Sequence, residues 1–182
     1  MKLLTGEAIG VLLAAGAGTR YGSPKVLADE GRWLDIAVRA LLEGGCEKAI
    51  VVLGAADSAM PDGAIAVHAH DWLVGMSASL KAGLSAAEGF SYAVVHVVDT
   101  PDVGPEVVRA VLDAARVSPS HLARAVFGGT PGHPVVFGRE HWDEVIATSS
   151  GDAGARAFLR SRFDVVAVDC SRWATGIDHD YR

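Results

Sequence analysis

The chain has 182 residues, half of them apolar, and its formal net charge is −6. This length and composition are typical of one globular α/β domain and exclude a disordered chain. The acidic balance argues against general nucleic-acid binding, which needs a basic surface, and no apolar run is long enough to span a membrane.

The N-terminus and the cysteines both point to the cytoplasm. Residues 1–7 are too short, and too soon interrupted by polar residues, to form a signal peptide. Cys46 and Cys170 stand far apart and outside any Cys/His cluster, so we interpret them as reduced thiols of the core rather than as metal ligands. We therefore expect a cytoplasmic protein.

Strand-like and helix-like segments alternate along the chain. Runs rich in β-branched residues predict strands at 8–14, 48–54, 65–68, 92–98 and 165–168. Apolar residues at helical spacing predict helices at 34–43, 75–88, 105–116, 139–148 and 153–161. A late hairpin is predicted from strands at 123–127 and 135–137, joined by a turn over 128–132. This order predicts βαβ units and a mainly parallel sheet, within one domain that spans residues 1–182.

The most informative segment follows the first predicted strand. It runs from Gly16 to Lys25 and combines three glycines with Arg20 and Lys25. Glycines let backbone N–H groups approach a phosphate closely, and the two cations can share the charge of a triphosphate. The spacing fits neither the Walker loop nor the dinucleotide loop Gly-x-Gly-x-x-Gly. We interpret the segment as a triphosphate-binding loop.

Two further segments should reach the same edge of the sheet. Asp99 directly follows the strand at 92–98, where a carboxylate can hold a cation that offsets phosphate charge, although a lone aspartate there is more often a turn residue. The segment 75–79 opens a helix. Its free N–H groups and the hydroxyls of Ser77 and Ser79 can cap that helix or contact a base.

Later in the chain, three residues allow two interpretations each. His133 lies between Pro131 and Pro134, either as an ordinary surface histidine or as a side chain presented to a ligand. Asp152 is a natural N-cap for the helix at 153–161, and Arg156 can reach an anionic acceptor or pair with an acid. The tryptophans are predicted to pack at the edges of the core: Trp33, Trp72, Trp142 and Trp173.

With these motifs the chain resembles the MobA-like nucleotidyltransferases, and specifically their molybdenum-cofactor cytidylyltransferase branch. The motifs fall in the family's order and span nearly the whole chain: 12–25, 71–80, Asp99-Thr100-Pro101, 131–134 and 151–156. The resemblance implies a three-layer α/β/α fold with a Rossmann-like, mainly parallel sheet of the nucleotide-diphospho-sugar transferase type.

The resemblance also assigns site residues. It implies that the nucleotide contacts Leu13, Ala14, Ala15, Gly16, Gly18, Thr19, Arg20, Lys25, Gly75 and Ser77. Guanylyl relatives usually carry a second glycine at the position of Ala15, so the sequence Ala14-Ala15-Gly16 favours CTP over GTP. Asp99 would hold Mg²⁺ with a second carboxylate from the stretch 176–181, either Asp178 or its rival Asp180. That stretch is shorter than in the family, and the alternative interpretation is an acidic tail that binds no metal. His133 and Arg156 would face the acceptor.

The implied reaction is Mg²⁺-dependent transfer of CMP from CTP to a phosphorylated acceptor, namely molybdopterin, with release of pyrophosphate. Arg20, Lys25 and Asp99 would be the catalytic residues, and a molybdoenzyme or its chaperone would receive the product. Two alternatives stay open. One is a nucleotidyltransferase for sugar phosphates or other small phosphates. The other is a non-catalytic carrier of a nucleotide or of the molybdenum cofactor, which the shortened C-terminal stretch favours.

Overall fold

The structure, a computed structural model, describes residues 5–181. The expectation that no signal peptide is present rests largely on residues 1–4, which lie outside the described residues. Within 5–181, none of the helices combines the length and apolar character needed to cross a bilayer.

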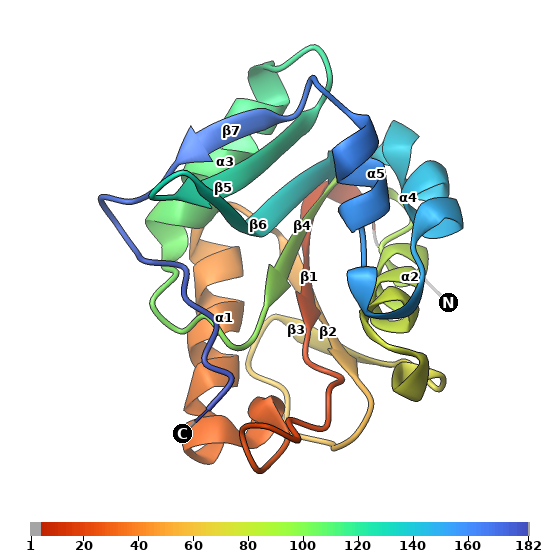
Figure 1. The fold of residues 1–182 in the computed structure, drawn as a ribbon, viewed down its shortest axis with the longest axis vertical. Helices are drawn as coiled ribbons and strands as arrows, with labels where there is room; N and C mark the ends of the chain where they lie inside the picture. The colour runs from red at the N-terminus through yellow and green to blue at the C-terminus, as the bar shows by residue number, and fades with distance from the viewer. Residues whose placement is uncertain (1–4, 182) are drawn as a thin grey trace.

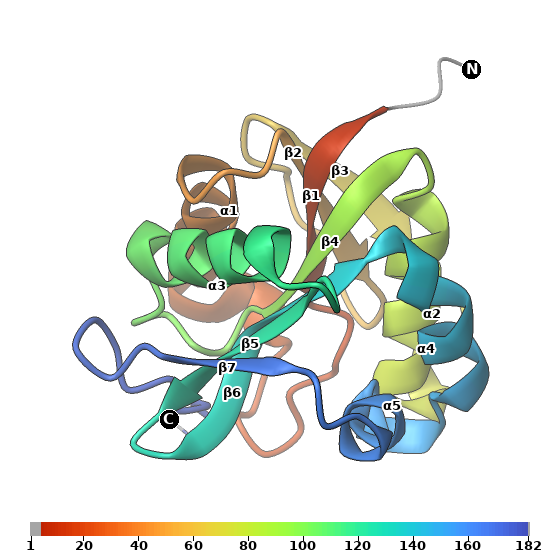
Figure 2. The same ribbon diagram turned by 90° about the horizontal axis from the view of Figure 1, so that it is seen from above.

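Seven strands form one sheet within the described residues, in the order β3-β2-β1-β4-β6-β5-β7 (Figures 1 and 2). Parallel pairing joins β1 to β2 and β4, β2 to β3, and β5 to β7, whereas β6 runs antiparallel to both of its neighbours. The mainly parallel sheet is therefore confirmed. The strands are β1 (Gly6–Leu13), β2 (Lys48–Leu53), β3 (Ala64–His68), β4 (Phe90–Val97), β5 (Leu122–Phe127), β6 (Thr130–Gly138) and β7 (Val166–Asp169).

Helices cover both faces of this sheet. Helices α1 and α3 lie on one face, and α2, α4 and α5 lie on the other, so that the fold has the predicted three layers (Figure 2). The α-helices are α1 (Arg32–Glu43), α2 (Met76–Ala86), α3 (Pro105–Val117), α4 (Trp142–Thr148) and α5 (Arg156–Ser161). Short 3₁₀ turns are η1 (Lys25–Gly31), η2 (Trp72–Val74), η3 (Arg139–His141) and η4 (Gly151–Ala153).

The central strand β1 explains why the sequence begins with an unbroken apolar run. Ile9 and Val11 pack with Leu80 of α2 on one face. Leu12 packs with Leu41 of α1 on the other. A strand buried on both faces has no polar side to alternate with. Its carboxyl end is therefore held rigidly where the glycine-rich loop begins.

The late hairpin is tighter than predicted. Phe127 pairs with Thr130, so the turn contains only Gly128 and Gly129, and both have positive φ. Two-residue turns of this kind match the twist of the flanking strands and need residues that tolerate positive φ. The predicted turn over 128–132 was wrong, because Pro131 already pairs with Val126.

The last two predicted helices are interrupted. The segment 139–148 begins as the 3₁₀ turn η3 before α4 starts at Trp142. The segment 153–161 is divided at Gly154, whose φ of 53° is not helical, and α5 begins only at Arg156. Asp152 therefore lies in η4 and caps no helix with its side chain, so its prediction as an N-cap was wrong.

Candidate active site

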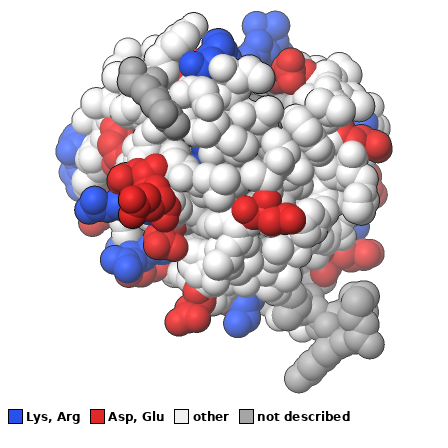
Figure 3. Space-filling view, turned by 90° about the horizontal axis from the view of Figure 1, so that it is seen from below, with Lys and Arg blue, Asp and Glu red and all other residues white. Residues whose placement is uncertain are grey.

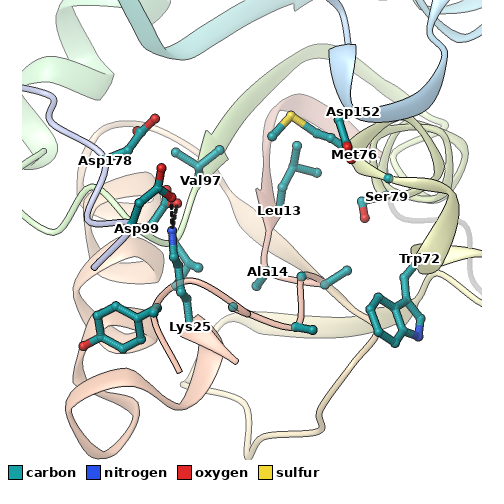
Figure 4. A pocket seen from close by; sticks show the side chains of 18 of the residues that line it. Leu13, Ala14, Lys25, Trp72, Met76, Ser79, Val97, Asp99, Asp152 and Asp178 are labelled. Atoms are coloured by element: carbon teal, nitrogen blue, oxygen red, sulfur yellow. Dashed lines mark hydrogen bonds and ion pairs between the residues drawn. The ribbon is translucent and has the colours of Figure 1, made fainter. Parts of the chain in front are cut away.

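A cleft of about 600 Å³ opens at the carboxyl ends of β1 and β4 (Figure 4). This volume suits a small-molecule ligand. All but one of the predicted site residues line it, the exception being Ser77. Those that do are Leu13, Ala14, Ala15, Gly16, Gly18, Thr19, Arg20, Lys25, Gly75, Asp99, His133, Arg156 and Asp178.

Backbone hydrogen bonds shape the glycine-rich loop. The N–H of Ala14 donates to the carbonyl of Val52 and the carbonyl of Ala15 accepts from Ala55, each at 3.0 Å, so the loop is still fastened to β2 after β1 has ended. Within the loop, the N–H of Gly22 donates to the carbonyl of Gly18 at 2.7 Å. This hydrogen bond closes the loop on itself between Gly18 and Gly22.

Two of the glycines serve different purposes. Gly18 has a φ of 61°, and a Cβ there would collide with the backbone of Ser23, so the loop conformation itself requires glycine. Gly16 lines the cleft, and a Cβ there would meet nothing within 4 Å. The fold would accept a side chain at Gly16, but the side chain would project into open space. The absence of a side chain there leaves room for a ligand.

Lys25 connects three parts of the chain. Its Nζ donates to Asp99 Oδ2 at 2.7 Å and to Asp180 Oδ1 at 2.9 Å (Figure 4). Burial opposes the charge on Lys25, but the hydrogen bonds to Asp180 and Asp99 outweigh it and raise the pKa of the ammonium. Lys25 is therefore a fixed cation, held only 14% exposed at the mouth of the loop.

Asp180 spans the two cations of the loop. Its second carboxylate oxygen lies 3.2 Å from an Arg20 guanidinium nitrogen, while the first accepts from Lys25. The hydrogen bond from Lys25 lowers the pKa of Asp180, so the group stays ionised. A carboxylate thus lies between the same two groups that are predicted to share the charge of a triphosphate.

Asp178 lies at the same end of the cleft as Asp99 (Figure 4). Partial removal from water raises its pKa first, and the negative charges of Asp99 and Asp180 raise it further. No group of three or more His, Cys, Asp or Glu among residues 5–181 is arranged to hold a metal by itself. Mg²⁺ is commonly held by one or two carboxylates together with substrate phosphates, and the mutual repulsion of Asp99 and Asp178 fits that role.

The opposite wall comes from the segment that precedes and opens α2. Trp72, Leu73, Met76 and Ser79 line the cleft, whereas Ser77 is buried and does not. Trp72 packs against the buried core, as predicted for a residue at a core edge, and it also lines the cleft. Its side chain lies over Gly54, where a Cβ would collide with it. Neither hydroxyl caps α2, whose N-cap residue is Gly75 with a φ of 121°.

His133 and Arg156 also line the cleft. His133 belongs to strand β6 rather than to a surface loop. Burial lowers its pKa to about 4, with the charge of Arg124 acting in the same direction, so the imidazole is neutral near pH 7. Arg156 forms no ion pair with any residue that the structure describes, which leaves its charge available to an anion.

A mainly parallel sheet carries a glycine-rich loop with two cations at one edge, together with the carboxylates Asp99, Asp178 and Asp180. The chain has the nucleotide-diphospho-sugar transferase fold. The model of the MobA-like NTP transferase domain matches residues 10–166. The chain therefore belongs to the MobA-like NTP transferase family.

Three relatives illustrate this relationship. The nicotine blue oxidoreductase of Paenarthrobacter nicotinovorans is 39% identical over 188 residues, which cover 94% of this chain and 91% of that protein. Rv0371c from Mycobacterium tuberculosis is 26% identical, with a TM-score of 0.78 over 98% of this chain and 95% of that one, and it has also been solved in complex with manganese. A nucleotidyl transferase from Methanothermobacter thermautotrophicus shares the fold, with a TM-score of 0.78 at 20% identity over 96% of this chain and 92% of that one.

Proposed function

We propose that the protein is a divalent-metal-dependent nucleotidyltransferase that transfers CMP from CTP to a phosphorylated small molecule and releases pyrophosphate. The observation that carries the proposal is the meeting of Arg20, Lys25, Asp99 and Asp178 in one cleft beside an open glycine at position 16. Cations for a triphosphate and carboxylates for a metal are the groups that phosphoryl chemistry needs in one place.

Each residue has a proposed task. Arg20 and Lys25 bind and orient the β- and γ-phosphates, so that the α-phosphate faces the acceptor in line. Asp99 and Asp178 are the residues that would hold Mg²⁺, which when bound neutralises charge on the phosphates. Neutral His133 can donate a hydrogen bond to the acceptor, and Arg156 can bind its phosphate.

The choice of nucleotide and acceptor is part of the proposal. The Ala14-Ala15-Gly16 spelling supports CTP over GTP, and we propose molybdopterin as the acceptor and a molybdoenzyme or its chaperone as the recipient. The manganese complex of Rv0371c supports a divalent metal in this chain too. We also propose a cytoplasmic location, which suits a protein whose two cysteines are buried and unpaired.

Pyrophosphate release tests the proposal. The intact chain is supplied with Mg²⁺, one of CTP, GTP, ATP or UTP, and either molybdopterin or a hexose 1-phosphate. Release with CTP and molybdopterin alone supports the proposal, whereas release with the sugar phosphate alone selects the sugar-nucleotide alternative. Nucleotide binding without release under any acceptor selects the non-catalytic carrier.

A matched pair of variants distinguishes the loss of a cation in the cleft from the general effect of removing a lysine. Lys25→Met removes the fixed cation of the cleft, and Lys48→Met removes an exposed lysine at the amino end of β2, the far end from the cleft. We expect the first to abolish release and the second to leave it unchanged. Full release by Lys25→Met would exclude the proposed role of this residue.

A second candidate function is the reduction of nicotine blue, the compound in the name of a relative. The observation that favours it is the 39% identity to the nicotine blue oxidoreductase. This function needs a second substrate that supplies the electrons, and NADH or NADPH is tested as that donor although the glycine-rich loop lacks the spacing Gly-x-Gly-x-x-Gly. Loss of the colour of nicotine blue together with consumption of NADH or NADPH, and no pyrophosphate release from any nucleotide, would select this function.

A further inference from the structure

The carboxylates Asp178 and Asp180 are carried by an irregular segment, residues 170–181, which we call the C-terminal strap. It leaves β7 and returns along the carboxyl end of the sheet to reach α1 (Figure 1). Cys170 is fully buried, but most of the later residues are exposed, Ile177 among them at 61%. The strap therefore gains little from apolar burial, and polar contacts must offset the entropy lost in fixing it.

One side chain supplies three of these contacts. Asp102 Oδ2 accepts hydrogen bonds from the N–H of Thr175 at 2.7 Å, from Thr175 Oγ1 at 2.6 Å and from the N–H of Gly176 at 3.3 Å. A carboxylate binds such donors about twice as strongly as a neutral acceptor does. The strap turns at this place, since Gly176 has a φ of 65° and packs so closely on Phe127 that a Cβ would collide with the ring.

The contact with Asp102 fixes the place of Asp178. Asp102 follows Asp99 by three residues on the same loop. One short piece of backbone therefore carries both Asp102, which binds the strap, and Asp99, which Asp178 must approach. On the other side of Asp178, the N–H of His179 donates to the carbonyl of Asp99 at 3.0 Å. Asp178 is thus held between two attachments to the loop 99–102.

We propose that Asp102 is a positioning residue, which fastens the strap so that Asp178 meets Asp99 and the two can share a divalent cation. The proposal rests on the proposed function for its metal. Asp102 does not line the cleft, so it acts through Asp178 and not on substrate. Residues that orient metal ligands in this way typically contribute about 10- to 100-fold to metal affinity.

The test is Mn²⁺ binding to the intact chain in the presence of CTP, obtained from calorimetric titrations of CTP at graded Mn²⁺ concentrations. We expect Asp102→Ala to weaken Mn²⁺ binding about 10-fold. Asp102→Asn keeps an acceptor oxygen and should restore most of it. Thr175→Val removes only the hydroxyl donor and should have a smaller effect in the same direction. Asp113→Ala, which removes an exposed aspartate paired with Arg116 on α3, is the matched control and should bind as the unmodified chain does.

Hydrogen exchange gives a second measurement that needs no metal. In Asp102→Ala the amides of residues 175–181, including the His179 N–H, should exchange faster, while those of β1 and β4 should not change. Unchanged Mn²⁺ affinity in Asp102→Ala and Thr175→Val, or unchanged exchange of the strap, would overturn the proposal. If the unmodified chain binds neither Mn²⁺ nor CTP, the proposed function itself fails. If it binds both and Asp102→Ala binds them equally well, only the role of Asp102 fails.

Discussion

The position of Asp180 predicts that removing its charge strengthens triphosphate binding. Its carboxylate bridges Arg20 and Lys25, so a ligand that needs both cations must displace it. The Arg20 side chain is 65% exposed, so its ion pair with Asp180 contributes little to holding Asp180 in place. The pair with Lys25, only 14% exposed on the lysine side, is the one that matters. Because Asp180 is itself one third exposed, we assign this pair about 1 kcal/mol.

Asp180→Asn should therefore bind inorganic tripolyphosphate and CTP about 5-fold more tightly in the absence of metal, since about 1.4 kcal/mol corresponds to a factor of ten. Calorimetric titration at fixed ionic strength measures this. Asp113→Asn changes the net charge equally but lies on α3, and it should show no such gain. Weaker binding by Asp180→Asn would refute the reasoning and identify Asp180 as a group that supports ligand binding.

Three further predictions follow from the site and the core. Gly16→Ala should keep the melting temperature but weaken CTP binding, because the new Cβ enters the open cleft. Gly18→Ala should lower the free energy of unfolding by at least about 1 kcal/mol, and the melting temperature by about 2–4 °C, because of the positive φ at this position. Scanning calorimetry and CTP titration check both variants. Lys25→Met should lower pyrophosphate release by about 100-fold or more while far-ultraviolet circular dichroism stays unchanged, and a smaller loss would show that Arg20 suffices. Burial, and then His133, lower the pKa of fully buried His96 to about 3, so below pH 6.5 only the unfolded chain takes up the proton. His96 alone should then lower stability by about 2 kcal/mol from pH 7 to pH 5, and urea denaturation of His96→Leu should show that much less pH dependence.

The sequence predicted the nucleotide half of the cleft because its signals are local. The apolar run of β1, the glycines and the two cations are consecutive, so pattern alone places them at a strand end. Asp99 was found in the same way, as the residue after a buried strand. Parallel pairing of β1 with β4 then brings the two strand ends together.

The contacts that the sequence did not predict are long-range or depend on side-chain direction. Lys25 and Asp180 are 155 residues apart, and no periodicity connects them. Ser77 and Ser79 open the same helix, but only the structure shows that Ser79 lines the cleft. Trp72 reaches the wall because Gly54, on a different strand end, leaves space beneath its ring. The division of the helix at 153–161 depends on the φ of one glycine, Gly154.

The reversed direction of β6 has a consequence for how such a cleft can change over evolutionary time. Because β6 runs antiparallel to β4, its beginning, with His133, lies at the edge where the parallel strands end. Most of the groups proposed for the nucleotide follow β1 and β4, in the middle of the sheet, while His133 is carried by a hairpin whose turn has open space around both glycines. Insertions at Gly128 and Gly129 could therefore reshape the acceptor side while the nucleotide side keeps its geometry. The boundary between β4 and β6 thus separates the strands that carry the glycine-rich loop and Asp99 from the hairpin that carries His133.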